Sequence, residues 1–277
     1  MPELPEVETV KRILEPQLAG RRITEVTVRR KDVIARTDAE AFARQVAGAA
    51  VTGMGRRGKF LTICLGERGT LVLHLRMTGQ LLVTPGDFPV EKHTHLLFQL
   101  DNGTQLRFID TRRFGRFWLI GEGEEDCFSG VGKLGPEPFD QALSADYLRE
   151  RLGKSRRAIK ECLLDQSVVA GIGNIYGDEI LFAAGLHPGR QAASLSEAEW
   201  LALSRAVPRI MSEGIRNDRM TAGEYLAGGG KEYRNEKFWK VYGREGEPCP
   251  RCGAALERLT VSGRGSCFCP CCQRRGS

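Results

Sequence analysis

Six of the nine cysteines lie in the C-terminal tail, and their spacing is typical of a metal site. Two pairs occur, and in each pair the cysteines are separated by two residues, which places two thiolates on one turn. The predicted ligands of one structural Zn²⁺ are Cys249, Cys252, Cys269 and Cys272. Cys267 and Cys271 lie beside the second pair, and either could replace one of its ligands. An odd number of cysteines argues against a framework of disulfides.

The N-terminus offers a second reactive group. Methionine before proline is normally removed, so we expect the secondary amine of Pro2 to be free. An α-amino group has an unperturbed pKa of about 7.7–8.0, so part of it is a neutral nucleophile that could attack a sugar C1′. Glu3 and Glu6 lie nearby in the sequence and could move protons. Proline and acids are also common in the first turn of any helix, which is the structural alternative.

Three further segments could contact a polyanion. Glycines at 171–173 stand before a helical pattern, where free N–H groups can bind phosphate, although a tight turn explains them equally well. The segments 74–79 and 110–115 each carry an apolar residue at a turn, Met77 and Phe114. Such residues can fill the gap that a flipped base leaves, but core packing is the simpler explanation for each of them.

Periodicity indicates the elements that position these groups. Apolar residues spaced three and four apart predict a helix over 3–18, and β-like runs with turns over 22–121 predict a sandwich, including a hairpin at Asn102-Gly103. Residues 122–143 are rich in turn formers and predict a linker. Helical patterns follow at 144–152, 155–165, 175–185 and 196–215. Weak periodicity predicts a long loop over 216–237.

Charge and composition restrict the function. The 277-residue chain carries a net charge of +6 and 41% hydrophobic residues, as expected of a globular protein with more than one domain. From Cys249 onward the sequence contains five arginines and only one acid, Glu257, so the tail suits a polyanionic partner. The sequence shows neither an apolar run of membrane length nor a secretory signal at its start, so we expect a cytoplasmic protein without a membrane partner.

Taken together, these motifs resemble the formamidopyrimidine-DNA glycosylases. The resemblance rests on residues 2–9, the Arg112–Phe114 segment, Gly171–Tyr176, the run 241–244 and the four-cysteine tail, in one order along nearly the whole chain. It implies an α+β multidomain fold with three parts. These are an N-terminal helix and β-sandwich over 1–121, a helical helix-two-turn-helix domain over 144–240 after the 122–143 linker, and a zinc ribbon over 241–277.

The resemblance also implies a function and the residues that perform it. A monomeric enzyme would excise oxidised purines from double-stranded DNA and cut the strand by β,δ-elimination, with no organic cofactor. Pro2 would form the Schiff base, Glu3 would transfer a proton and Arg112 would pair with the orphaned cytosine. The implied catalytic residues are Pro2, Glu3, Glu6, Lys59 and Arg264. The implied DNA-binding residues are His74, Met77, His93, Arg112, Phe114, Lys160 and Asn174.

One region departs from the family pattern, and two other functions compete. In the segment 216–240, where the family usually has a Gly-rich run ending in an aromatic residue, the sequence is altered and more charged, a difference that concerns lesion preference more than catalysis. A member of the endonuclease VIII group would share Pro2 and Glu3 but prefer oxidised pyrimidines; it commonly has glycine where Leu4 stands. A non-catalytic zinc-dependent DNA-binding protein would need neither Lys59 nor Arg264.

Overall fold

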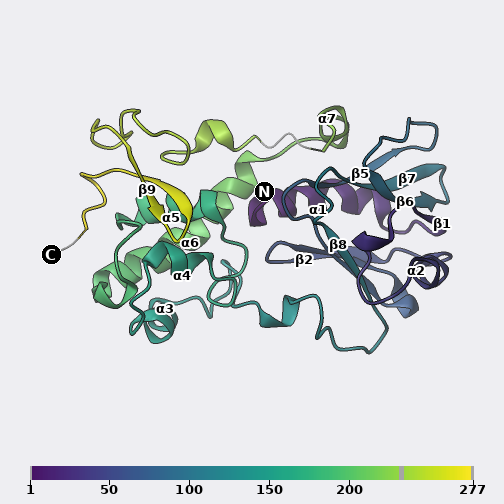
Figure 1. Ribbon diagram of the computed structural model, residues 1–277, viewed down its shortest axis with the longest axis horizontal. Coiled ribbons are helices and arrows are strands. Elements are labelled where there is room, and N and C mark those ends of the chain that lie inside the picture. Colours follow the sequence, from purple (N-terminus) through teal and green to yellow (C-terminus); the bar gives the residue numbers. More distant parts are fainter. Residues whose placement is uncertain (1, 231–233, 276–277) are drawn as a thin grey trace. The chain divides into compact units, whose positions relative to one another are not determined.

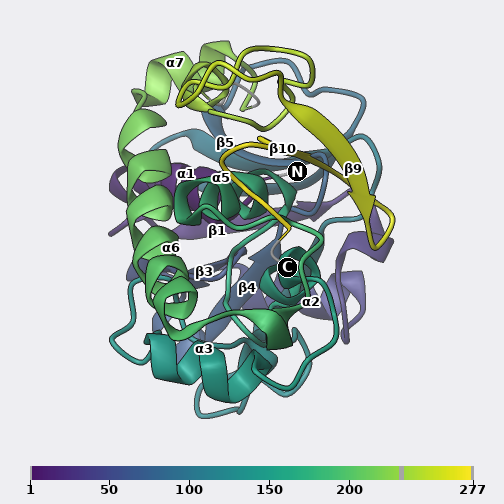
Figure 2. The same cartoon turned by 90° about the vertical axis from the view of Figure 1, so that its left-hand side faces the viewer.

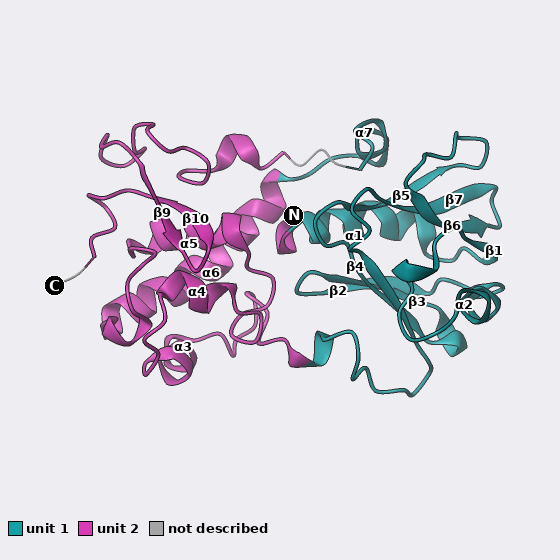
Figure 3. Cartoon of the chain, in the orientation of Figure 1, with its two compact units in different colours: residues 1–2, 6–132, 218–233 teal, residues 3–5, 133–217, 234–277 magenta. Residues whose placement is uncertain are grey.

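The computed structural model describes residues 2–230 and 234–275 of the chain. These residues form two compact units (Figure 3). Unit 1 contains the described residues 2, 6–132 and 218–230, and unit 2 contains the described residues 3–5, 133–217 and 234–275. Each unit has a hydrophobic core of its own.

Unit 1 is built on two four-stranded antiparallel sheets (Figure 1). The first has the order β1-β6-β7-β5. Its strands are β1 (Ile23–Val28), β5 (Gly79–Pro85), β6 (Thr94–Leu100) and β7 (Thr104–Asp110). The second has the order β2-β3-β4-β8. Its strands are β2 (Gly53–Arg57), β3 (Phe60–Cys64), β4 (Thr70–His74) and β8 (Arg116–Ile120).

Aromatic rings join the two sheets and confirm the predicted sandwich. Phe117 of β8 is fully buried, and its ring centroid lies 4.9 Å from that of Phe108 and 6.2 Å from that of Phe98 in the other sheet. The predicted hairpin at 102–103 joins β6 to β7, with Gly103 at a φ of +83° that its lack of a Cβ allows. Burying large rings from both sheets contributes to this unit's stability.

Helices α1 and α2 cover parts of this unit, and the first of them was predicted. Helix α1 (Leu4–Leu18) buries the apolar face predicted from the sequence, including Val10 and Leu14, which are both fully buried. Helix α2 (Ala39–Val46) was not predicted, although Asp38 caps it by accepting a hydrogen bond from the N–H of Ala41. Short 3₁₀ turns occupy Lys31–Val33, Gly66–Arg68 and Val131–Lys133.

Unit 2 is helical and contains the four helices that the sequence predicts. They are α3 (Ala145–Leu152), α4 (Ile159–Leu164), α5 (Asn174–Ala184) and α6 (Glu197–Asn217). The long helix α6 packs against α5 and α3 (Figure 2). Two successive turns over 165–173 connect α4 to α5, which gives a helix-two-turn-helix. A two-stranded hairpin follows, formed by β9 (Glu257–Val261) and β10 (Arg264–Phe268).

The prediction of one long loop over 216–237 is wrong for much of that segment. Helix α6 continues to Asn217, and a separate helix α7 spans Ala222–Ala227. A capping box between Thr221 and Glu224 starts α7, a local signal that three-residue spacing in the sequence could have revealed. Tyr225 of α7 joins the sandwich core and is 2% exposed. Residues 231–233 lie outside the described residues.

Shorter pieces complete the chain. Ala192–Ser194 and Glu236–Phe238 are 3₁₀ turns. None of the helices in the described part of the chain is both long and apolar enough to cross a bilayer.

Candidate active site and metal centre

The carboxylate of Glu3 is buried at the first turn of α5. It accepts three backbone hydrogen bonds, from the N–H groups of Gly173 (2.7 Å), Ile175 (2.9 Å) and Tyr176 (3.3 Å). The first N–H groups of a helix have no partner within the helix and carry a partial positive charge, so they bind an anion well. The side chain is 2% exposed. Helix α5 therefore fixes the residue that directly follows Pro2, which is itself buried.

Two glycines allow this close approach. A Cβ on Gly173 would lie 2.3 Å from the Glu3 carboxyl carbon, and one on Gly171 would lie 2.4 Å from a methyl group of Leu4. Gly171 also has a φ of +90°, which glycine adopts without strain. The sequence left two explanations open for these glycines, N–H groups free for phosphate or a tight turn, and the first is wrong for the three N–H groups that bind Glu3. The glycines instead seat the N-terminus of the protein.

The zinc hairpin docks on the same helix. The carbonyl of Gly265 accepts hydrogen bonds from the Asn174 amide (3.1 Å) and the Lys160 ammonium (3.2 Å). Lys160 also contacts Asp178 at 2.7 Å. Burial lowers the pKa of Lys160 and raises the pKa of Asp178 to about 6. The opposite charge of the partner acts the other way on each pKa but is the smaller effect.

Lys160 was predicted to bind DNA, and the structure corrects that prediction. Its side chain is fully buried. The ammonium group reaches Asp178 and Gly265, so it supports the fold of unit 2 and is not available to a phosphate.

Arg264 stands exposed at the start of β10, directly after the hairpin turn. Ser262 and Gly263 form that turn with φ values of 47° and 76°. Because Gly265 bonds to Asn174, the hairpin carries Arg264 to the beginning of α5. Three residues predicted from the sequence, Glu3, Asn174 and Arg264, are thus gathered at one end of one helix.

Sequence reasoning missed Glu179, which follows Asp178 on α5. Its buried carboxylate accepts hydrogen bonds from three successive N–H groups, those of Lys240, Val241 and Tyr242. Burial raises the pKa of Glu179, and the three donors oppose that effect. Helix α5 therefore also holds the segment that leads into the zinc ribbon. The apolar patterning of α5 gives no sign of this contact.

The structure brings the four predicted zinc ligands together. The Sγ atoms of Cys249, Cys252, Cys269 and Cys272 all lie within 4.8 Å of one another. The separations are 4.0 Å between Cys249 and Cys272 and 3.5 Å between Cys252 and Cys269. Zn–S bonds of about 2.3 Å in a tetrahedron require S–S distances of roughly 3.8 Å, so the thiolates fit one structural zinc ion. Cys267 and Cys271 lie outside this cluster.

In unit 1 the three residues Met77, Arg112 and Phe114 lie together and are exposed. The Arg112 guanidinium lies 3.0 Å from the Met77 sulfur and 4.7 Å from the centre of the Phe114 ring. Met77 and Phe114 are each 47% exposed. Core packing is therefore not their role. An arginine stacked on an aromatic ring is held in a defined direction while its remaining donors stay available.

Asp110 organises this cluster, and sequence reasoning assigned it no role. Its buried carboxylate accepts hydrogen bonds from the Thr78 hydroxyl, the Arg112 N–H (3.1 Å) and the Gly115 N–H (2.8 Å). One side chain thereby fixes both loops that carry the exposed residues. An acid at the end of an apolar strand, just before a turn that ends in glycine, was the available signal.

His74 is held neutral beside Lys59. Burial, the charge of Arg76 and the charge of Lys59 lower the pKa of His74 to about 3. Its Nδ1 accepts the Arg76 N–H at 2.9 Å, which assigns the ring proton to Nε2. Its ring packs edge-on against Phe60, the residue after Lys59, at 4.7 Å. Lys59 and Glu6 are both buried in unit 1, at 7% and 4% exposure.

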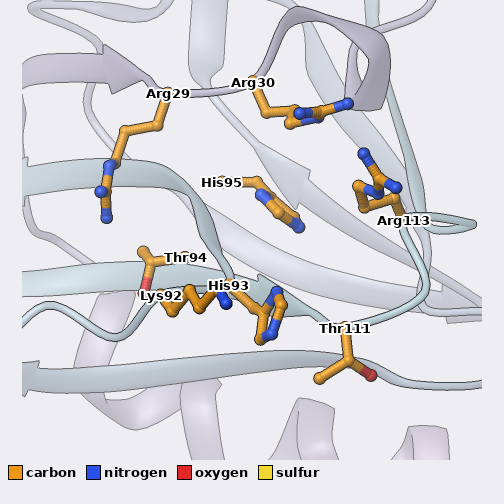
Figure 4. Close-up of a pocket in the computed structure, with 8 residues that line it drawn as sticks. All are labelled: Arg29, Arg30, Lys92, His93, Thr94, His95, Thr111 and Arg113. Atoms are coloured by element: carbon orange, nitrogen blue, oxygen red, sulfur yellow. The ribbon is translucent and has the colours of Figure 1, made fainter.

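A basic pocket of about 330 Å³ also lies in unit 1 (Figure 4). Its lining residues are Arg29, Arg30, Lys92, His93, Thr94, His95, Thr111 and Arg113. The half-buried His93, predicted to contact DNA, belongs to this pocket. His95 hydrogen-bonds the carbonyl of Asp110 at 2.7 Å and so ties the pocket to the loop that carries Arg112. Converging cations of this kind suit phosphate.

Two glycines of the same turn and helix should respond oppositely to alanine. Gly177→Ala meets no atom closer than 3.5 Å and should stabilise α5 by about 0.5–1 kcal/mol. Gly173→Ala drives Glu3 from its three donors and should cost about 1–3 kcal/mol for each buried group left unpaired. Thermal melting of both variants tests this. Equal melting temperatures would show that the turn does not hold Glu3 tightly.

Removing one zinc ligand should release the metal, whereas removing a neighbouring cysteine should not. Cys269→Ser loses a thiolate of the tetrahedron and should abolish stoichiometric zinc binding. Cys271→Ser should retain one zinc per chain. The zinc content of the two purified variants tests this prediction. Loss of zinc from Cys271→Ser together with retention in Cys269→Ser would show that Cys271 is a ligand.

The buried His74 should make unit 1 less stable in acid. Its pKa of about 3 lies below the ordinary 6.5, so the unfolded chain binds more protons between these values and stability falls as the pH drops. Between pH 7 and 4.5 the loss from this residue should be about 2–3 kcal/mol. Urea unfolding at both pH values should show a smaller loss for His74→Gln. An identical loss in both proteins would contradict a buried neutral imidazole.

Comparison with known proteins agrees with this arrangement. Family models match residues 1–117 (formamidopyrimidine-DNA glycosylase N-terminal domain), 134–226 (the H2TH domain of the same enzymes) and 246–275 (zinc finger found in FPG and IleRS). The chain is 50% identical to the formamidopyrimidine-DNA glycosylase of Moorella thermoacetica over 94% of each chain. It is 46% identical to that of Desulforamulus reducens over 99% of each.

A solved structure is similar over the whole chain. The Lactococcus lactis enzyme in complex with DNA containing an abasic site matches with a TM-score of 0.90 and 36% identity, covering 98% of this chain and 99% of that one. The buried Glu3 at α5, the zinc ribbon and three matched domains all point to one conclusion: the chain belongs to the formamidopyrimidine-DNA glycosylase family.

Proposed function

We propose that this protein is a bifunctional DNA glycosylase and abasic-site lyase that excises oxidised purines from duplex DNA in base excision repair. The observation that carries the proposal is the placement of Glu3, whose carboxylate is held at α5 directly after Pro2. Arg264 and Asn174 stand at the same helix end. A non-catalytic DNA-binding protein has no need to bury an acid beside its N-terminus.

Base release begins at Pro2 once Met1 has been removed. The neutral amine attacks C1′ of the damaged nucleotide, the N–C1′ bond forms, and the glycosidic bond breaks as the base leaves with a proton. We assign this proton transfer to Glu3, whose carboxylate passes the proton that the Pro2 nitrogen loses on bonding to C1′ to the departing base. A carboxylate held by three N–H groups also stabilises the positive charge that develops at C1′ next to it. Glu6 is the second acid available to this step.

The C1′–O4′ bond of the sugar then breaks as O4′ takes up a proton, which leaves an iminium ion on Pro2, and strand cutting follows from this ion. Loss of a proton from C2′ breaks the bond between C3′ and its oxygen, and a second elimination breaks the bond between C5′ and its oxygen. We assign Lys59 to the first elimination and Arg264 to the second. The zinc ion holds the ribbon that carries Arg264 and takes no part in these steps.

Residues outside the reacting centre bind the DNA. Met77, Arg112 and Phe114 are exposed together, which suits filling the gap of an extruded base. Arg112 has the donors that an unpaired cytosine can accept. We propose that His74, His93 and Asn174 contact or support contacts to phosphates, and that the basic pocket around His93 contributes to them.

The substrate is proposed to include 8-oxoguanine and formamidopyrimidines. Structures of the L. lactis relative contain DNA with Fapy-dG or with an oxidised pyrimidine, so this fold accepts more than one lesion. Helix α7 and the segment after it, which we propose cap the lesion, belong to the sequence segment 216–240 that differs from the family pattern. They are the part of this chain that would set preference.

The protein is proposed to act as a monomer in the bacterial cytoplasm, where the chromosome lies. The relatives named above are bacterial enzymes.

Borohydride trapping on two duplexes tests the proposed function. A 32P-labelled duplex with 8-oxoguanine opposite cytosine and one with thymine glycol are incubated in parallel with the protein and reductant. A trapped complex on the first, formed faster than on the second, is expected. Faster trapping on thymine glycol would assign the protein to the endonuclease VIII type of specificity, and trapping on neither would contradict catalysis.

Substitutions of the proposed nucleophile Pro2 and the proposed acid Glu3 should impair different steps. The mass of the active protein should lack Met1, and Pro2→Gly should lose most trapping. Glu3→Gln should block base release, because departure needs a proton, yet bind DNA nearly as well as wild type, because binding rests on phosphate contacts. Band shifts and excision assays separate these effects. Full activity in a protein that retains Met1 would disprove the role of Pro2.

Substitutions of Phe114 and Arg112 should distinguish a stacking role from a base-pairing role. Extruding a base costs a few kcal/mol. Phe114→Ala should slow excision opposite every base, because stacking is blind to sequence. Arg112→Ala should slow excision most opposite cytosine and so flatten the preference for the opposite base.

Single-turnover excision opposite each of the four bases measures both effects. Cutting of a preformed abasic site, from which no base must be extruded, is the control and should change little. A full cytosine preference in Arg112→Ala would show that this arginine clamps phosphate instead.

A further inference from the structure

Asp178 joins three elements of unit 2 through one buried carboxylate. It lies on α5 and is 1% exposed. One of its oxygens lies 2.7 Å from the Lys160 ammonium on α4, and the other accepts the N–H of Cys267 on β10 at 3.0 Å. A fully buried charge pair tolerates little displacement, because either partner alone would be a buried unpaired charge.

The same edge of β10 is held at a second point. The carbonyl of Gly265 accepts hydrogen bonds from Lys160 and Asn174. Residues two apart in a strand direct their N–H and C=O groups to the same side, so Gly265 and Cys267 both face α5 with the same edge. Lys160 contacts Asp178 and Gly265 together, which makes the two attachments one network.

This network and the zinc site restrain β10 at different places. After β10, the first cysteine of the metal cluster is Cys269, which directly follows the end of the strand at Phe268. The α5 network holds the strand at Gly265 and Cys267, and Arg264 directly precedes Gly265. The zinc therefore keeps the ribbon folded, while the direction of its tip toward the start of α5 depends on the network.

We propose that Asp178 is a positioning residue that places Arg264 relative to the Glu3 end of α5 and thereby sets how often β-elimination proceeds to δ-elimination. The inference rests on the proposed lyase function and on the role assigned there to Arg264. Asp178 does not touch the DNA and takes no part in forming or breaking bonds.

The product ratio of the lyase tests this inference. Asp178→Asn keeps the shape of the side chain but removes its charge. On a duplex with a preformed abasic site, the ratio of δ- to β-elimination product should fall about tenfold, because small displacements of a catalytic group cost rate steeply. Zinc content should stay at one per chain. Because the δ product forms from the β product, the ratio is compared at equal concentrations of active, zinc-loaded protein, so that a loss of folded protein does not change it.

A matched control removes the charge of an acid in an exposed ion pair of the same unit. Glu197 of α6 pairs with Arg149 at 2.6 Å, and its side chain is 72% exposed. Glu197→Gln should keep the wild-type product ratio. If Asp178→Asn does not fold, the double variant Lys160→Met/Asp178→Leu, which removes both buried charges together, is measured by the same ratio.

The outcomes distinguish the inference from the function on which it rests. A wild-type ratio in zinc-loaded Asp178→Asn, or in the double variant where that is used, overturns the positioning role and leaves the proposed function intact. Failure of the wild-type protein to yield either product contradicts the proposed function itself.

Discussion

The arrangement of unit 2 depends on the carboxylate of Glu3 bound to the first N–H groups of α5. A buried anion is costly unless its lone pairs are satisfied, and here three donors of one helix start satisfy them. The contact spans about 170 residues of sequence, so it ties the N-terminus to the middle of the chain. Gly171 and Gly173 are required because any side chain there would occupy the space of Leu4 and Glu3.

Helix α5 serves as the common support of this unit. Its start holds Glu3, and its next turn holds two further segments, the zinc hairpin through Asp178 and the entry to the ribbon through Glu179. These three attachments use carboxylates against backbone N–H groups, which are directional and short. The result is a frame in which Glu3, Asn174 and Arg264 lie at one end of one helix.

In unit 1 a buried carboxylate likewise accepts hydrogen bonds from separate segments, and there it holds two loops that carry exposed residues. The buried Asp110 collects hydrogen bonds from two loops, and this leaves Met77 and Phe114 exposed instead of packed. Exposed apolar residues on loops tend to collapse onto the surface, so a fixed backbone is needed to keep them available. The basic pocket beside these loops is lined by residues of three separate segments, around 29–30, 92–95 and 111–113.

The sequence predicted features that repeat locally and missed those that depend on distant partners. The apolar face of α1, the β-sandwich, the four helices of unit 2 and the four-cysteine cluster were predicted because periodicity and spacing encode them. Helix α2 was missed because it lies among β-like runs, and α7 because glycines lie within and after it, although the spacing of its capping box was visible.

The functions of individual polar residues were harder to predict. For the turn at 171–173, phosphate binding and a tight turn stayed equally open, since a sequence cannot reveal that Glu3 occupies those N–H groups. Lys160 was expected at the DNA, but burial beside Asp178 gives it a structural partner. In both cases the residue type correctly indicated a group that binds an anion. The sequence could not show that a carboxylate of the same chain, Glu3 or Asp178, is the anion bound.

Mapping the covalent bond to DNA tests the central claim that the chain's own N-terminal amine is the nucleophile. The complex reduced by borohydride on an 8-oxoguanine duplex is digested with nuclease and trypsin, and the modified peptide is sequenced by mass spectrometry. The account predicts a sugar remnant on Pro2, in the peptide that ends at Lys11. A remnant on Lys59 or on any other lysine would contradict it.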